Sequence, residues 1–114
     1  MKNYNNLAEL IMDKDNYPNA GGLYIEKSKT GDLKNARYWV ISSKETKEEG
    51  YITDERGERP AILRDFDVKS LLDIQTFQDI INLKMKNNPE LRLEQTDVFL
   101  EAILYYLEHD DFMD

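Results

Sequence analysis

The stretch from Arg37 to Ser43 constrains the fold more than any other part of the chain. Four large apolar side chains follow one another there: Tyr38, Trp39, Val40 and Ile41. Aromatic and β-branched residues favour strands, and side chains alternate between the two faces of a strand. Tyr38 and Val40 therefore share one face, and the two residues that alternate with them share the other. Because both faces need cover, we expect a central strand of a small sheet.

The residues before this strand predict its pairing. Leu23-Tyr24-Ile25 is a second run of strand-forming residues, and Thr30-Gly31-Asp32 between the two runs has the composition of a turn. We therefore expect an antiparallel hairpin. Downstream, the sequence predicts four segments: a charged loop at 44–50, a third strand at 51–53, a turn around Gly57 at 54–60, and an edge strand or an extended link at 61–68.

Two helices are expected in the last third of the chain. Residues 76–79 have the spacing of a capping box, with Asp79 in place of the usual Glu, and the helix they begin ends at Asn87-Asn88-Pro89. The final helix is predicted over residues 95–108. The predicted inward residues are Phe77, Ile80, Ile81 and Met85 in the first helix, and Phe99, Ala102, Ile103 and Tyr106 in the second, with Val98 and Tyr105 flanking them.

The start of the chain adds one more helix. Leu7, Leu10 and Ile11 have helical spacing, and Asn5 or Asn6 precedes them as a cap. A chain of 114 residues has the usual length of one domain. The fold class that we expect is α+β: a small antiparallel sheet covered on one face by an N-terminal helix and two C-terminal helices, in a single domain over residues 1–114.

The residue types exclude several kinds of site. The chain has no cysteine, which removes disulfides, thiolate chemistry and Cys-rich zinc sites. The first residues lack the continuous apolar run of a signal peptide, and no segment approaches the roughly 20 apolar residues of a membrane span. We therefore expect a cytoplasmic protein without a cofactor.

Negative charge is concentrated toward the C-terminus. The net charge is −8; residues 1–57 hold nine Lys and Arg against ten Asp and Glu, whereas residues 58–114 hold six against thirteen. From Glu94 onward there are seven acids and no Lys or Arg. Such a field disfavours nucleic acid and anionic membranes as partners and favours a basic protein. The alternative interpretation is that the acidity contributes only to solubility.

Catalytic hypotheses find weak support in the sequence. His109, the one histidine, could act as a base or a metal ligand beside its acidic neighbours, but a solvated residue near a helix C-terminus is the favoured interpretation. Asp65 and Asp67 could hold Mg²⁺ for a phosphoryl-transfer reaction, although Phe66 pointing inward explains the alternation equally well. We predict that the protein is not an enzyme and has no metal site.

Three clusters of acids, two of which include aromatic residues, are candidates for binding a partner. In such a surface a tyrosine anchors the contact and carboxylates attract a basic protein, whereas the alternative is a solvated loop beside an aromatic core stripe. The first cluster is Glu45, Glu48 and Glu49; the second is Tyr51, Asp54, Glu55 and Glu58; the third is Tyr105, Glu108, Asp110, Asp111 and Phe112.

Two C-terminal segments resemble a family of known function. The segment Leu71-Leu-Asp-Ile-Gln-Thr-Phe-Gln-Asp-Ile-Ile81 is followed by Phe99-Leu-Glu-Ala-Ile-Leu-Tyr-Tyr-Leu-Glu-His-Asp-Asp-Phe112. Together they resemble the immunity proteins of bacterial contact-dependent growth inhibition, a group of toxin-immunity proteins. The resemblance covers about the last 45 residues and, more loosely, the hairpin. The helix around Ala102, which ends in Tyr105-Tyr106 and Asp110-Asp111-Phe112, is its most specific element.

The resemblance implies that the protein binds and neutralises a cognate toxin domain, usually a nuclease and in some cases one that cleaves tRNA. An acidic inhibitor suits a nuclease, because the cleft that grips phosphates is basic. No binding residue is transferred from the family. The alternative is a nucleic-acid mimic that inhibits a DNA-binding enzyme through carboxylates along one face, and the 15 Lys and Arg interspersed along the chain count against it.

Overall fold

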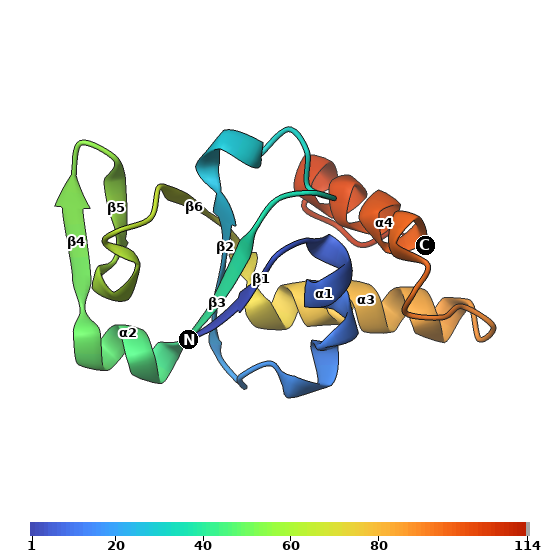
Figure 1. Ribbon diagram of the computed structural model, residues 1–114. Coiled ribbons are helices and arrows are strands. Elements are labelled where there is room, and N and C mark those ends of the chain that lie inside the picture. The colour runs from blue at the N-terminus through green and yellow to red at the C-terminus, as the bar shows by residue number, and fades with distance from the viewer. Residues whose placement is uncertain (114) are drawn as a thin grey trace.

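A four-stranded antiparallel sheet runs through the middle of the molecule (Figure 1). The computed structural model describes residues 1–113. The strands lie in the order β1-β3-β2-β6, so β3 has a partner on both sides, as predicted. Their bounds are Lys2–Tyr4 for β1, Gly21–Glu26 for β2, Tyr38–Ser42 for β3 and Val68–Asp73 for β6. The expected hairpin is confirmed, with Leu23 opposite Val40 and Tyr24 opposite Trp39.

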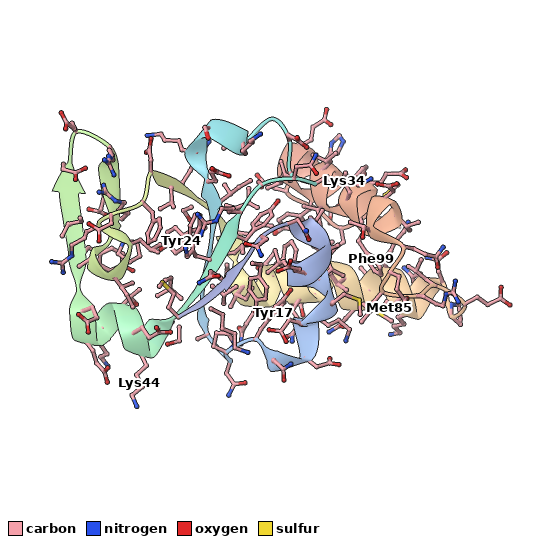
Figure 2. The ribbon with its side chains drawn as sticks, in the orientation of Figure 1. Tyr17, Tyr24, Lys34, Lys44, Met85 and Phe99 are labelled. Carbon is pink, nitrogen blue, oxygen red and sulfur yellow. The ribbon has the colours of Figure 1, made fainter. Side chains whose placement is uncertain are left out.

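Three helices cover one face of this sheet and bury the larger core against it. They are α1 (Leu7–Met12), α3 (Ile74–Asn87) and α4 (Thr96–His109). Phe77 and Phe99 are fully buried between these helices and the sheet residues Leu23, Tyr38 and Val40. Figure 2 shows Phe99 and Met85 on this helical side. The α+β class and the helical cover of one face are therefore confirmed.

The opposite face of the sheet carries a smaller core. Trp39 and Ile41 lie there with Tyr24, Leu63 and Val68, as the alternation along β3 predicts. Beyond it stands a unit that we call the hairpin lobe, residues 43–60, at the far left of Figure 1. The lobe consists of α2 (Ser43–Glu49) and a separate two-stranded sheet of β4 (Tyr51–Asp54) and β5 (Gly57–Pro60).

The charged loop predicted at 44–50 is wrong, because those residues form α2. The Ser42 hydroxyl accepts a hydrogen bond from the Glu45 backbone N–H at 3.1 Å, and the Glu45 carboxylate accepts one from the Ser42 N–H at 3.1 Å. This reciprocal capping box satisfies two free donors at the start of the helix. Gly50 ends it with a φ of 74°, a conformation that glycine adopts without strain.

Four further expectations need correction. The strand at 51–53 pairs only with β5 and does not join the main sheet. Residues 61–68 are mostly a 3₁₀ turn (Ala61–Leu63) and a bend, and the edge strand is β6. The helix α3 begins at Ile74 rather than Thr76, because the Asp73 carboxylate accepts from the Gln75 N–H at 2.8 Å and caps it there. The strand β1 was not expected.

The long axis of the molecule separates the lobe from the helical side. The principal extents are 44 × 27 × 25 Å. The hairpin lobe lies at one end, and α4 with the C-terminal residues lies at the other (Figure 1). Two further 3₁₀ turns, Lys14–Asn16 and Lys27–Lys29, connect the elements between them. None of the helices in residues 1–113 combines the length and apolar character needed to cross a bilayer.

Candidate functional site

The fold brings two of the three predicted clusters together and sets the third apart. Glu45, Glu48 and Glu49 lie on α2, and the second cluster lies on the adjoining β4–β5 hairpin, so both belong to the hairpin lobe. The third cluster belongs to the end of α4 and the residues after it, at the opposite end of the long axis (Figure 1). One compact partner therefore contacts either the lobe or α4, not all three clusters.

Within the lobe, Glu45 has a structural role. Besides the capping box, its carboxylate forms an ion pair with the N-terminal ammonium group of Met1. Burial raises the pKa of this carboxyl, but the hydrogen bonds from the ammonium group and from Ser42 outweigh burial and bring the pKa below its usual value. Glu45 is thus held in place by the protein itself.

Asp54 is likewise engaged inside the lobe. Its two carboxylate oxygens accept from the Arg59 guanidinium at 2.7 and 2.9 Å. Arg59 is 2% exposed and also donates to the carbonyls of Leu63 and Arg64 at 3.2 and 2.7 Å. The hydrogen bond from Arg59, and next the one from the Arg56 N–H, lower the pKa of Asp54 to about 2. This pair fastens the hairpin to the segment that follows it.

The remaining acids of the lobe form no salt bridge within the described residues, and nearby cations offset most of their charge. Within residues 1–113, no salt bridge within 4.0 Å involves Glu48, Glu49, Glu55 or Glu58. They are interspersed with the cations Lys44, Lys47 and Arg56, so the unpaired charges nearly cancel. Figure 2 shows Lys44 at the outer edge of α2. The lobe therefore offers little net field to attract a basic partner.

Tyr51 is the prominent apolar feature of the lobe, with 58% of its surface exposed. Thr53 pairs with Glu58 and Tyr51 with Pro60, so Tyr51 and Glu58 lie on the same face of the hairpin. That face is near Tyr24 on the main sheet, which Figure 2 shows beside the lobe. Burial, and then the proximity of Tyr51 and Glu58, raises the pKa of the Tyr24 hydroxyl.

The exposed side of α4 combines apolar and acidic residues. Leu104 and Tyr105 are adjacent and are 47% and 37% exposed. Glu101 and Glu108 lie three or four residues from both, which places them on the same side of the helix. Six acids and no Lys or Arg occur between residues 94 and 113. This part of the chain is strongly acidic, and it carries exposed apolar side chains.

The sequence interpretation missed Leu104 and Glu101. The signal was present, since Leu100, Leu104 and Leu107 recur at intervals of four and three residues, in addition to the inward stripe. Leu100 and Leu107 are half-buried and pack against the main core, whereas Leu104 projects furthest from it. The helix is thus apolar on its inward face and along part of its outward face.

The C-terminal end of α4 carries acids close to the negative end of the helix dipole. Asp110 follows the last helical residue with φ 53° and ψ 31°, the left-handed region, and is the one residue other than glycine with positive φ in residues 1–113. Asp111 accepts from the Phe112 N–H at 2.8 Å, and the Phe112 ring packs on Tyr106 at 5.2 Å between ring centroids. The negative end of the helix dipole therefore lies beside Glu108, Asp110 and Asp111.

The candidate catalytic residues are not assembled into a site. His109 is exposed, its ring stacks on Tyr105 at 4.2 Å, and its Nε2 atom is 3.9 Å from Glu108. Asp65 and Asp67 are exposed and lie outside any strand, while Phe66 packs on Trp39 at 5.1 Å. In the part of the chain that the structure describes, no group of three His, Cys, Asp or Glu residues has a geometry that could hold a metal ion.

Two shallow surface hollows lie away from His109, Asp65 and Asp67. One hollow, of about 640 Å³, is open to solvent beside α1 and is lined in part by Tyr4, Met12 and Asp13. Two of its polar groups are engaged with each other, because the Tyr4 hydroxyl donates to Asp13 at 2.6 Å. A second hollow of about 360 Å³ lies between α3 and Phe112.

Comparison with known proteins places the chain in a family without assigning an activity. No match was found among curated proteins, and none among solved structures. One family model matches residues 4–114, nearly the whole chain, and its description is Domain of unknown function (DUF7716). The protein belongs to this DUF7716 family.

Proposed function

We propose that the protein is a cytoplasmic immunity protein, which binds a cognate basic toxin domain and prevents that domain from reaching its substrate. The observation that carries the proposal is the exposed side of α4, where Leu104 and Tyr105 lie among acids without a neighbouring cation on the helix. An apolar centre with a charged surround is the usual anatomy of a protein-binding surface.

Electrostatics supports a basic partner and a rapid encounter. The acids of α4 and of the residues after it carry much of the net charge of −8. A positively charged toxin would be steered toward this end of the molecule, and a nuclease has such a surface because it must hold phosphates. Once docked there, the protein would block the substrate groove of the toxin by occupying it. A tRNA-cleaving nuclease is the first candidate, and no turnover is involved.

The nucleic-acid mimic is less well supported than a toxin-binding protein. A mimic presents carboxylates at regular intervals to a phosphate-binding surface, but Leu104 and Tyr105 interrupt the acids of α4. Apolar side chains of this size contribute to a contact with protein side chains rather than to one with phosphate-binding cations.

Co-expression tests the proposal. The reading frame next to this one in its operon is placed under inducible control, and growth and co-purification are measured with and without the protein. The expected result is that the neighbouring product arrests growth and that the protein restores growth and forms a stable complex with it. A harmless neighbouring product, or growth arrest without rescue or complex, would refute the immunity function.

Two matched charge reversals locate the surface in the same assay. E101K/E108K alters exposed glutamates of α4, and E48K/E49K makes the same change in charge on exposed glutamates of α2 at the other end of the molecule. We expect rescue to be lost with the first pair and kept with the second. The opposite pattern would assign binding to the hairpin lobe and remove α4 as the binding surface.

A further inference from the structure

We infer that the exposed side of α4 is a docking surface for an amphipathic, basic α-helix of the partner protein. This inference rests on the proposed function and names the element that the same surface receives. Its starting point is the arrangement of side chains in two rows along the helix axis, in which Leu104 and the acids are exposed and Leu100 and Leu107 are half-buried.

The first row is apolar and the second is acidic. Leu100, Leu104 and Leu107 follow one another at intervals of four and three residues, so they lie in line over about 10 Å of helix. Asp97, Glu101 and Glu108 form the second row beside them, at intervals of four and seven residues. The shallow groove between two such rows is the feature into which the side-chain ridge of another helix packs.

A helix suits this surface better than a strand. An extended peptide gains its affinity by pairing its backbone with the free edge of a sheet. The middle of α4 offers no such edge, because backbone groups within a helix are bonded to one another. Contact must therefore come from side chains alone.

Charge selects a basic helix over a second copy of this chain. If α4 packed against the α4 of another copy, the two acidic rows would lie close together and repel, at a molecular charge of −8 each. Asp97 already pairs with Lys34 at 2.9 Å, an arrangement that shows how a cation from outside α4 is accommodated by this row. Figure 2 places Lys34 next to α4. Within residues 1–113, no Lys or Arg lies within 4.0 Å of the carboxylates of Glu101 and Glu108, and Glu108 is 3.9 Å from His109. A partner with Lys or Arg at matching intervals would therefore complete the row.

The test uses designed helical peptides and the full chain. The first peptide carries Leu at intervals of three and four residues with Lys beside them; in the second, Glu replaces each Lys; in the third, Ser replaces each Leu. Affinity is measured by fluorescence anisotropy at low and physiological salt. A contact confined to one 14-residue helix lies at the small end of interfaces, below about 1,200 Å², so micromolar affinity is expected for the first peptide.

Variants of the protein then locate the binding. We expect E101Q/E108Q and Leu104→Ala each to weaken binding of the first peptide about tenfold, a loss of about 1.4 kcal/mol. E48Q/E49Q, the matched change on α2, should leave the affinity unchanged. Because the substituted side chains are exposed, thermal unfolding should show each variant folded. Amide chemical-shift changes on peptide addition should be confined to α4 and its neighbours.

Three results would overturn the inference. These are equal affinity for the Lys and Glu peptides, binding that the α4 variants leave unchanged, and a wild-type dimer at micromolar concentration that Leu104→Ala dissociates. The last result would identify a second copy as the occupant. Failure of the peptide test leaves rescue in the co-expression assay intact, and failure of rescue leaves peptide binding intact, so the two proposals are separable.

Discussion

Asp110 lies where both its charge and its backbone conformation destabilise the fold, so replacing it should stabilise the protein. Its carboxylate follows the last turn of α4, where the helix dipole is negative, and removing such a charge contributes about 0.3–1 kcal/mol. The φ of 53° adds a conformational cost of roughly 1–2 kcal/mol for a residue with a Cβ atom, of which glycine recovers only part because it is more flexible when unfolded. We expect about 0.5 kcal/mol from Asp110→Asn and about 1.5 kcal/mol from Asp110→Gly.

Thermal and urea unfolding separate the two contributions. At about 4 °C per kcal/mol, the Tm should rise by roughly 2 °C for the Asn variant and 6 °C for the Gly variant. The gain from Asn should shrink at high salt, whereas the difference between Gly and Asn should not. Glu55→Gln, at an exposed acid in the turn between β4 and β5, is the control and should be neutral. A Gly variant no more stable than the Asn variant would show that the backbone conformation carries no strain.

Three further changes test the core, the hairpin lobe and the sheet. Phe77→Ala removes a fully buried ring and should lower the free energy of unfolding, measured in urea, by about 3–5 kcal/mol. Tyr51→Ala on the surface should change it by less than about 0.5 kcal/mol, and similar losses of stability in the two variants would place Phe77 outside the core. The pKa of Asp54 is about 2 instead of 3.8, so its pairing with Arg59 stabilises the protein above pH 3.8, and that contribution is lost as the pH falls toward 2. The difference in unfolding free energy between wild type and Asp54→Asn should therefore narrow between pH 3.8 and 2, and a constant difference would contradict the pairing. A Cβ atom on Gly21 would overlap the Ile41 carbonyl oxygen and lie 3.0 Å from the Ser42 Cα, so Gly21→Ala should destabilise the protein by about 1–3 kcal/mol. Gly31→Ala, whose Cβ would meet nothing within 4 Å, should be neutral or slightly stabilising, and equal Tm values for the two variants would contradict the close approach at Gly21.

The sequence predicts the parts of the fold that have a strong apolar pattern. Alternation along β3 and helical spacing in α3 and α4 identify these elements and their buried faces, because burial of those residues is what stabilises them. The end of α3 at Asn87 is also predicted, since Pro89 cannot continue a helix. These elements build the main core.

The elements that the sequence interpretation missed are held by polar contacts or by distant partners. The helix α2 buries no residue, so it has no apolar period, although Ser42 and Glu45 have the spacing of a capping box and Gly50 follows it as a stop. The strand β1 is three residues long and exists through its pairing with β3. The closure of β4 on β5 depends on Arg59, whose four acceptor groups are known only once the chain is folded.

The same limit applies to the candidate site. Residue types identified the acids, but not which of them the protein uses internally. Glu45 caps α2 and Asp54 binds Arg59, and neither role follows from the count of charges. The separation of the lobe from α4 along the 44 Å axis also depends on the fold and not on the sequence interval.

The two groups of acids differ in what they do for stability, and that difference favours α4 as the binding surface. In the lobe, Glu45 and Asp54 lie where a carboxylate stabilises the structure. On α4, Asp97 is paired with Lys34, but the acids at the C-terminal end oppose the helix dipole. Leu104 leaves 47% of its surface exposed in the free protein. A basic helix docked on α4 would neutralise these charges and bury that leucine, so each feature that destabilises the free protein would stabilise the complex.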